Sequence, residues 1–117
     1  MKIVAGSASK HVARYLAGSL GAQLVEVQAR RFPDDECYVR IMDNLDGSDV
    51  VLVQTTYPDR NLVEALLLQD AIHDFKIRKL ITVVPYMGYA RQDKKFNEGE
   101  PVSARAMAKV ISQRTDG

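Results

Sequence analysis

Residues 50–84 read VVLVQTTYPDRNLVEALLLQDAIHDFKIRKLITVV, and this stretch decides the fold class. It begins and ends with short apolar runs, residues 50–53 and 80–84, which are typical of strands covered on both faces of a sheet. Between them, apolar residues recur at helical spacing after a cap at Asp59 or Asn61. A strand, a helix and a second strand in this order predict parallel strands of an α/β domain.

The helix of this stretch is apolar over more than one face. One face at helical spacing comprises Leu62, Ala65, Leu66, Gln69 and Ile72. Three further apolar side chains widen the surface beyond a single stripe: Val63, Leu67 and Leu68. Such a helix is either fully covered in the core or part of a subunit interface, and the sequence leaves both alternatives open.

The chain before residue 50 continues the alternation. Residues 3–5 form a first strand, Ser7 or Ser9 caps a helix that ends at Gly21, and residues 24–27 form a second strand. The core face of this first helix is expected to comprise Val12, Tyr15, Leu16 and Leu20. Together these elements predict a mainly parallel sheet flanked by helices.

A last helix is expected to begin near Pro101, because proline suits the first position of a helix. Its core face is expected to comprise Ala104, Met107, Ala108 and Ile111. In this alternation a helix normally returns to a further strand, and residues 112–117 do not read as one. We therefore expect a single truncated domain over residues 1–117, with the last strand or strands of the sheet missing.

Composition excludes several classes of protein. The 117 residues include 16 basic and 15 acidic side chains, and this balance argues against a dedicated nucleic-acid binder. The sequence contains neither a signal peptide nor an apolar run long enough to span a membrane. Cys37 is the only cysteine, so no internal disulfide can form and a cytoplasmic location is expected. No Ser/His/Asp or Cys/His arrangement suggests a catalytic nucleophile.

Two polar stretches interrupt the scaffold, and the first is residues 31–41. If this stretch is extended, alternate side chains share a face. One such face combines aromatic rings with carboxylates: Phe32, Asp34, Glu36, Tyr38 and Arg40. An aromatic ring can stack on a nucleobase, and carboxylates accept hydrogen bonds from an exocyclic amine or a ribose hydroxyl. The alternative is the charged outer face of a half-buried, protruding hairpin, and the spacing of the acids predicts no metal site.

The second polar stretch, residues 85–101, directly follows an apolar strand. Ligands of open α/β sheets bind beyond the carboxyl ends of the strands, so this position suits a binding site. Arg91 offers a planar cation for stacking or phosphate contact, and Gln92 offers both a donor and an acceptor. The alternative is a solvated loop of mixed charge.

The two stretches belong to a set of three ordered motifs. These are RFPDDE at 31–36, NLVE at 61–64 and PYMGYARQDKK at 85–95, the last followed by PVSAR at 101–105. In these motifs the chain resembles ribose-phosphate pyrophosphokinase, the phosphoribosyl pyrophosphate synthetase family. The YARQDKK string is highly specific to that family. The resemblance spans essentially the whole chain and corresponds to the N-terminal portion of a longer, two-domain enzyme.

The resemblance implies a phosphoribosyltransferase-like fold and a diphosphotransferase activity. Members of the family transfer diphosphate from ATP to ribose 5-phosphate, with Mg²⁺, and yield phosphoribosyl pyrophosphate and AMP. They assemble as homo-oligomers, dimers or hexamers, in which each ATP site is built across a subunit interface. We therefore expect ATP and a second copy of the chain as partners, and neither nucleic acid nor membrane.

The resemblance also assigns roles to individual residues. Phe32 would stack on the adenine from one subunit, with Asp34 and Glu36 holding the polar edge of the base. Arg91 of the partner would cover the other face of the base, and Gln92 would contact the nucleotide. The implied nucleotide-binding residues are Phe32, Asp34, Asp35, Glu36, Arg91 and Gln92. Many relatives have glycine where Asp35 stands, so the local turn is expected to differ slightly.

Three functional segments of the family have no counterpart in residues 1–117. They are the Asp-Leu-His metal segment, the mobile loop with a catalytic lysine and arginine, and the threonine-rich ribose-phosphate loop. We therefore expect no catalytic residue and no protein ligand of Mg²⁺ in this chain, and no synthetase activity from it alone. The alternatives to an enzyme fragment are a non-catalytic partner of the synthetase and an independent nucleotide-binding module. The coding sequence downstream of Gly117 would discriminate among them.

Overall fold

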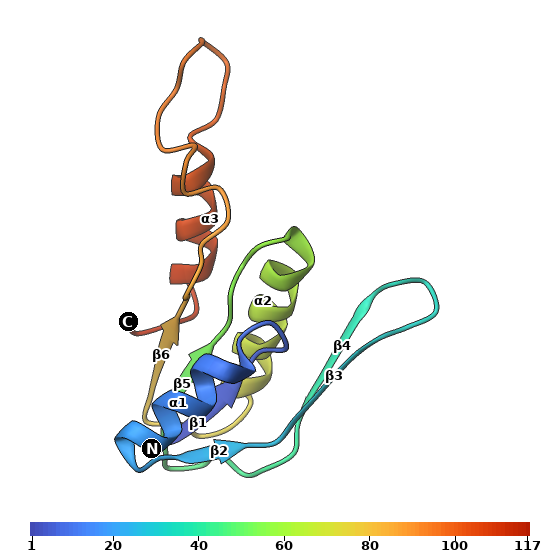
Figure 1. The fold of residues 1–117 in the computed structure, drawn as a ribbon, viewed down its shortest axis with the longest axis vertical. Helices are drawn as coiled ribbons and strands as arrows, with labels where there is room; N and C mark the ends of the chain where they lie inside the picture. The colour runs from blue at the N-terminus through green and yellow to red at the C-terminus, as the bar shows by residue number, and fades with distance from the viewer.

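A computed structural model of residues 1–117 shows a parallel sheet flanked by helices, with a separate hairpin that protrudes from it (Figure 1). The sheet has the strand order β2-β1-β5-β6. Its strands are β1 (Lys2–Ala5), β2 (Gln23–Val25), β5 (Asp49–Val53) and β6 (Lys79–Val83). The hairpin pairs β3 (Val27–Arg31) with β4 (Cys37–Ile41), and the helices are α1 (Lys10–Leu20), α2 (Asp59–His73) and α3 (Ser103–Ser112). The predicted α/β class and protruding hairpin are confirmed.

The two faces of the sheet bury separate apolar clusters. On one face, α2 contributes Leu68 and Ile72, which pack with Val50 and Leu52 of β5. On the other face, α1 packs against alternate residues of the same strands: Ile3, Val51 and Val53. Consecutive strand residues therefore point into opposite clusters, as expected for strands covered on both sides. Each fully buried aliphatic side chain of this kind stabilises the fold by about 1.5–3 kcal/mol.

The buried face of α1 agrees only in part with the predicted one: Val12 and Leu16 pack against the core as expected. Tyr15 and Leu20 are exposed, by 72% and 56%, whereas the small residues Ala13 and Ala17 are buried. The helix lies close to the sheet, so alanine rather than a larger side chain fits at its centre. Gly21 ends the helix with a left-handed backbone (φ 60°), as its position after the last turn predicted.

The second strand is also shorter than predicted. Strand β2 ends at Val25, and Val27 already begins the hairpin by pairing with Ile41. The change of partner occurs at Glu26, whose carbonyl accepts the N–H of Met42 at 3.0 Å. The extended residues 23–31 therefore belong to two different sheets. The apolar pattern alone does not show where one sheet ends and the other begins.

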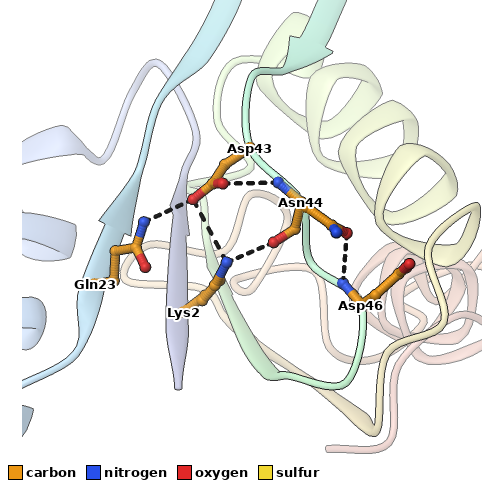
Figure 2. A network of polar contacts seen from close by, with 5 residues as sticks. All are labelled: Lys2, Gln23, Asp43, Asn44 and Asp46. Atoms are coloured by element: carbon orange, nitrogen blue, oxygen red, sulfur yellow. Dashed lines mark hydrogen bonds and ion pairs between the residues drawn. The ribbon is translucent and has the colours of Figure 1, made fainter.

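A polar network holds the base of this hairpin against the sheet (Figure 2). The Asp43 carboxylate accepts a hydrogen bond from Gln23 of β2 at 2.6 Å and pairs with Lys2 of β1 at 3.5 Å. The Lys2 ammonium also donates to the Asn44 carbonyl, and the Asn44 side chain accepts the N–H of Asp46 at 2.9 Å. The return of the chain from β4 is thus tied to the edge of the sheet, which fixes the direction in which the hairpin protrudes.

Helix α2 is not fully covered. Leu68 and Ile72 are buried, but Val63 and Leu67 remain exposed by 47% and 38%. The alternative of a completely covered core helix is therefore wrong for this chain. No helix in the structure is both long enough and apolar enough to cross a bilayer.

The last helix begins at Ser103, two residues later than predicted, and buries only Ile111 fully. Of its predicted core face, Ala108 is exposed, because α3 stands away from the sheet together with the loop that precedes it (Figure 1).

The tail after α3 lies along the free edge of β6. The N–H of Asp116 donates to the Leu80 carbonyl at 2.8 Å, and the N–H of Thr82 donates to the Gly117 carbonyl at 2.9 Å. Strand-like pairing therefore begins in a segment for which no strand was predicted. The division of a longer enzyme into this and a second domain stays a prediction.

A buried polar cluster joins the carboxyl ends of β1 and β5 to α2. Gln54 is fully buried, and its side chain donates to Glu64 of α2 at 2.8 Å and accepts the N–H of Ala8 at 3.2 Å. The Glu64 carboxylate also accepts the N–H and the hydroxyl of Ser7, both at 2.6 Å. Each buried polar side chain of this cluster thus has hydrogen-bond partners, which is the condition for burying it at modest cost.

Gly6 leaves the room that this cluster needs, and alanine at that position should be strongly destabilising. An added Cβ would lie 2.1 Å from Oε1 and 2.7 Å from Cβ of Gln54. We expect Gly6→Ala to lower the free energy of unfolding by about 1–3 kcal/mol through overpacking. Urea denaturation followed by circular dichroism measures this change.

Gly18→Ala is the matched control. Gly18 lies within α1, and an added Cβ would meet nothing within 4 Å. This variant should stabilise the chain by about 0.5–1 kcal/mol, because alanine is the better helix former. Equal stabilities of the two variants would contradict the account of the Gln54 cluster.

Candidate functional site

The candidate site residues lie at two separate places on one chain. The turn between β3 and β4 carries Phe32 and the neighbouring acids, whereas Arg91 and Gln92 belong to the long loop between β6 and α3. Figure 1 shows the hairpin turn at the right and the loop at the top of the molecule, on different projections. A single chain therefore does not bring Phe32 and Arg91 together.

The hairpin turn is tighter than the extended stretch that the sequence predicted. The N–H of Phe32 donates to the Glu36 carbonyl, and the N–H of Asp35 donates to the Phe32 carbonyl, both at 2.8 Å. Asp35 takes a left-handed backbone (φ 71°), a conformation that favours glycine over residues with a Cβ. Strict alternation of faces is therefore wrong over residues 32–36, although it holds in β4, where Val39 and Ile41 pack on the core.

Asp34 stabilises this turn rather than standing free. Its carboxylate accepts the N–H of Glu36 at 3.0 Å, and this backbone hydrogen bond holds the pKa of Asp34 below its ordinary value. Arg31 adds a bond from its guanidinium to the Asp35 carbonyl at 3.0 Å. Because the pKa is lowered, the Asp34 contribution is present at neutral pH and is lost as the pH falls through the lowered value.

An aromatic platform stands beside the turn. The rings of Phe32 and Tyr38 meet edge to face, with centroids 5.6 Å apart, and the Arg30 guanidinium lies 4.7 Å from the centroid of Tyr38. Phe32 nevertheless remains 44% exposed, so its ring has area available for a planar ligand. The predicted pairing of Phe32 and Tyr38 on one face is confirmed. Arg30 was missed, because only the hairpin register places it directly opposite Tyr38.

The loop after β6 is anchored to the segment that follows β5. The N–H of Gly88 donates to the Thr56 hydroxyl at 3.0 Å, and the N–H of Thr56 donates to the Tyr86 carbonyl at 3.0 Å. A Cβ on Gly88 would lie 3.0 Å from the Thr56 carbonyl oxygen, so glycine permits this close approach. The start of the loop is thereby fixed beside the carboxyl end of β5.

Further along the loop, Gln92 is oriented by the start of α3. Its Oε1 accepts the Ser103 hydroxyl at 2.9 Å, and its carbonyl accepts the N–H of Ala104 at 3.0 Å. With Oε1 engaged, the side chain presents its Nε2 donor to a ligand. Arg91 beside it is exposed and forms no ion pair, so its guanidinium is available for stacking or for an anion.

A cavity of about 570 Å³ opens beyond the carboxyl ends of β5 and β6. Its lining consists of Tyr57, Pro58, Asp59, Arg60, Tyr89 and Gln92. The volume suits a small-molecule ligand, and the position is the one at which open α/β sheets bind ligands. Of the predicted site residues only Gln92 lines it. Residues 57–60 were not predicted to face a ligand. They follow β5, which pairs with β6, the strand that precedes Arg91.

Cys37 faces the protein rather than a ligand. The thiol is half-buried, and burial, with a further contribution from the Glu64 charge, raises its pKa above the ordinary value. The Cys37 thiol is therefore shielded rather than activated as a nucleophile.

Comparison with known proteins identifies the family of this chain. The family model for the N-terminal domain of ribose phosphate pyrophosphokinase matches residues 1–114. The ribose-phosphate pyrophosphokinase of Methanosarcina mazei is 46% identical over 112 residues, which cover 96% of this chain and 37% of the relative. That of Halobacterium salinarum is 45% identical over 114 residues, which cover 97% of this chain and 41% of the relative. The chain thus spans about 40% of the length of these relatives.

The fold agrees with that of a solved structure. The crystal structure of phosphoribosylpyrophosphate synthetase from Mycobacterium smegmatis superposes with a TM-score of 0.84 at 29% identity, and covers 97% of this chain and 39% of that chain. The resemblance inferred from the three motifs is confirmed.

The raised pKa of Cys37 predicts slow alkylation. A raised pKa leaves less thiolate at a given pH, and the thiolate is the form that reacts with iodoacetamide. The rate of alkylation of the folded chain should therefore rise at a higher pH than the rate of the same chain unfolded in guanidinium. Because Cys37 is the only cysteine, incorporated label reports on this residue alone. An inflection at or below that of the unfolded chain would contradict the shielding.

Proposed function

The chain belongs to the ribose-phosphate pyrophosphokinase family through its N-terminal domain, and on this premise we propose that it is part of a ribose-phosphate diphosphokinase. The whole enzyme would transfer diphosphate from ATP to ribose 5-phosphate and release AMP. The residues present here would contribute to binding ATP, and in particular its adenine base.

The separation of Phe32 from Arg91 carries this proposal. Phe32 is an exposed aromatic ring at the tip of a protruding hairpin, and Arg91 is an unpaired guanidinium on a loop elsewhere on the chain. An aromatic ring and a guanidinium are the two groups that stack on opposite faces of a purine. A second copy of the chain would place the hairpin of one subunit against the loop of the other, so that each adenine is held by two subunits.

The hydrogen-bonding groups of the proposed site have complementary chemistry. Gln92 presents an Nε2 donor that suits an acceptor on the base or the ribose, because Ser103 engages its oxygen. On the hairpin side, Asp34, Asp35 and Glu36 carry carboxylates that suit the exocyclic amine of adenine. The nucleotide-binding set we propose is therefore Phe32, Asp34, Asp35, Glu36, Arg91 and Gln92.

Mg²⁺ would accompany ATP in the full enzyme, and we propose that the protein ligands of this ion lie outside residues 1–117. The chain contains no group of three or more His, Cys, Asp or Glu side chains that could hold a metal ion. We propose that such ligands, the catalytic residues and the ribose 5-phosphate pocket belong to sequence beyond residue 117.

The assembly would be a homo-oligomer, a dimer or a hexamer, in the cytoplasm. A free cysteine and the absence of disulfides suit a reducing compartment. The exposed Val63 and Leu67 on α2 offer apolar area for contact with another protein. The same observation is what favours the second candidate, a non-catalytic subunit that associates with a synthetase.

A site shared between subunits predicts complementation of two defective variants. Phe32→Ala should weaken binding of a non-hydrolysable ATP analogue by about 1–3 kcal/mol through lost stacking, and Arg91→Ala by about 0.5–2 kcal/mol. In a random mixture of the two variants, about a quarter of the sites should combine an intact Phe32 from one subunit with an intact Arg91 from the other. These sites should bind the analogue tightly. Isothermal titration calorimetry measures affinity and stoichiometry for each sample.

Two exposed residues provide the controls for this experiment. Phe96 is 74% exposed on the same loop as Arg91, and Arg14 is an exposed residue of α1 without an ion pair. Phe96→Ala and Arg14→Ala should bind like the unaltered chain. Unchanged affinity in both site variants would refute the assignment, and loss of binding without recovery on mixing would refute its division between subunits.

The 117-residue chain alone should show no synthetase activity. With ATP, ribose 5-phosphate and Mg²⁺, release of AMP should not exceed the level without ribose 5-phosphate, because in-line transfer requires charge-stabilising groups that this stretch does not supply. A coupled assay for AMP measures this, with a full-length synthetase as positive control. Robust release of AMP that depends on ribose 5-phosphate would show that these residues suffice.

A further inference from the structure

Tyr89 adopts a backbone conformation that tyrosine rarely takes. Its φ is 68°, in the left-handed region that disfavours residues with a Cβ. Such a conformation persists where the surrounding contacts enforce it. The loop between β6 and α3 must therefore be held at this residue by something stronger than its own local preference.

The Tyr89 side chain supplies that hold. Its hydroxyl donates a hydrogen bond of 2.7 Å to Oδ1 of Asp59, thirty positions away in the sequence. This bond, together with the charge of Asp59, raises the pKa of Tyr89, which keeps the hydroxyl protonated and able to donate. A bond to an ionised acceptor is among the stronger hydrogen bonds in proteins.

Asp59 is well placed to serve as a fixed acceptor. It occupies the first turn of α2, where the helix dipole favours a negative charge. The helix itself is anchored by the buried Glu64 and Leu68 further along. Tyr89 is thus tied to a rigid element of the core and not to another mobile loop.

The contacts of Tyr89 extend to the proposed nucleotide-binding residues. Its carbonyl accepts the N–H of Gln92 at 2.9 Å, so the chain from Tyr89 through Arg91 to Gln92 forms one tight turn. Tyr89, Asp59 and Gln92 all line the same cavity. The hydroxyl of Tyr89 therefore fixes one end of the turn, and Ser103 fixes the other through Gln92.

We propose that Tyr89 is a positioning residue, whose hydrogen bond to Asp59 latches the turn bearing Arg91 and Gln92 onto α2 in the orientation that receives the nucleotide. This inference rests on the proposed function and adds to it Tyr89 and Asp59, neither of which needs to touch the base. The latch lowers the cost of ordering Arg91 and Gln92 when the nucleotide binds.

Tyr89→Phe removes the latch and leaves the ring in place. We expect this variant to bind the ATP analogue about threefold to tenfold more weakly, the effect of losing one such hydrogen bond. Amide hydrogen exchange of the peptide covering residues 88–93 should become faster, because the Gln92 N–H is protected only while the turn is held. Calorimetry and exchange followed by mass spectrometry provide the two readouts on the same 117-residue chain.

Tyr86→Phe is the matched control. Tyr86 lies in the same loop, is 56% exposed, and its hydroxyl donates no hydrogen bond within the chain, so both readouts should stay unchanged. At the other end of the latch, Asp59→Asn keeps an acceptor and should lose less affinity than Asp59→Ala. This graded order is not expected if Asp59 acts only through helix stability.

The outcomes separate this inference from the proposed function. Binding by Tyr89→Phe equal to that of the unaltered chain would overturn the positioning role, even if its exchange were faster. Unchanged exchange would overturn the latch itself. If the unaltered chain bound no ATP analogue at concentrations at which it self-associates, the proposed nucleotide site would fail and the positioning role with it, whereas the exchange data would still decide whether the latch exists.

Discussion

The buried contact between Glu64, Gln54 and Ser7 is the constraint on which the rest of the structure depends. A carboxylate that is 4% exposed needs its hydrogen bonds, and here they come from the loop after β1 and from the residue that follows β5. The contact therefore sets the height of α2 over the sheet. From that height follow the position of Asp59 and Arg60 at the start of α2, and hence the wall of the cavity beyond β5.

The loop between β6 and α3 is arranged around this anchored segment. Thr56, two residues beyond Gln54, accepts the N–H of Gly88 at its hydroxyl and donates its own N–H to the Tyr86 carbonyl, and Asp59 accepts the Tyr89 hydroxyl. An exposed loop of mixed charge is thus held at several points before it reaches Arg91 and Gln92. The hairpin is held in an equivalent way at its base by Lys2, Gln23 and Asp43, while its tip projects from the molecule (Figures 1 and 2). Two ordered segments on separate projections are compatible with the proposed site shared between subunits.

Some features of the fold followed from the sequence because they depend on local periodicity. The apolar run 50–53 became a buried strand, and the helix after it buries Ala65, Gln69 and Ile72 of its predicted face. The run 80–84 became the edge strand β6, in which only Leu80 is buried, so its predicted coverage on both faces is wrong. Other features did not follow, because they depend on distance between elements. The close approach of α1 to the sheet selected Ala13 and Ala17 for burial over the larger Tyr15 and Leu20. Likewise Glu64 scores as a solvent-exposed residue in any hydropathy pattern, yet it is the centre of the buried polar cluster.

The sequence by itself determined the family and the identity of the candidate nucleotide-binding residues, because a motif such as YARQDKK is a linear property of the chain. It also indicated a mainly parallel sheet, since a strand–helix–strand order favours parallel strands. Only the tertiary structure decided that Phe32 and Arg91 lie on separate projections, that residues 32–36 turn rather than extend, and that Tyr89 is tied to Asp59. The turn over residues 32–36 is closed by hydrogen bonds within the turn, which an alternating pattern does not reveal. The bond between Tyr89 and Asp59 joins residues thirty positions apart, which meet only when the sheet has brought the strand ends to one edge.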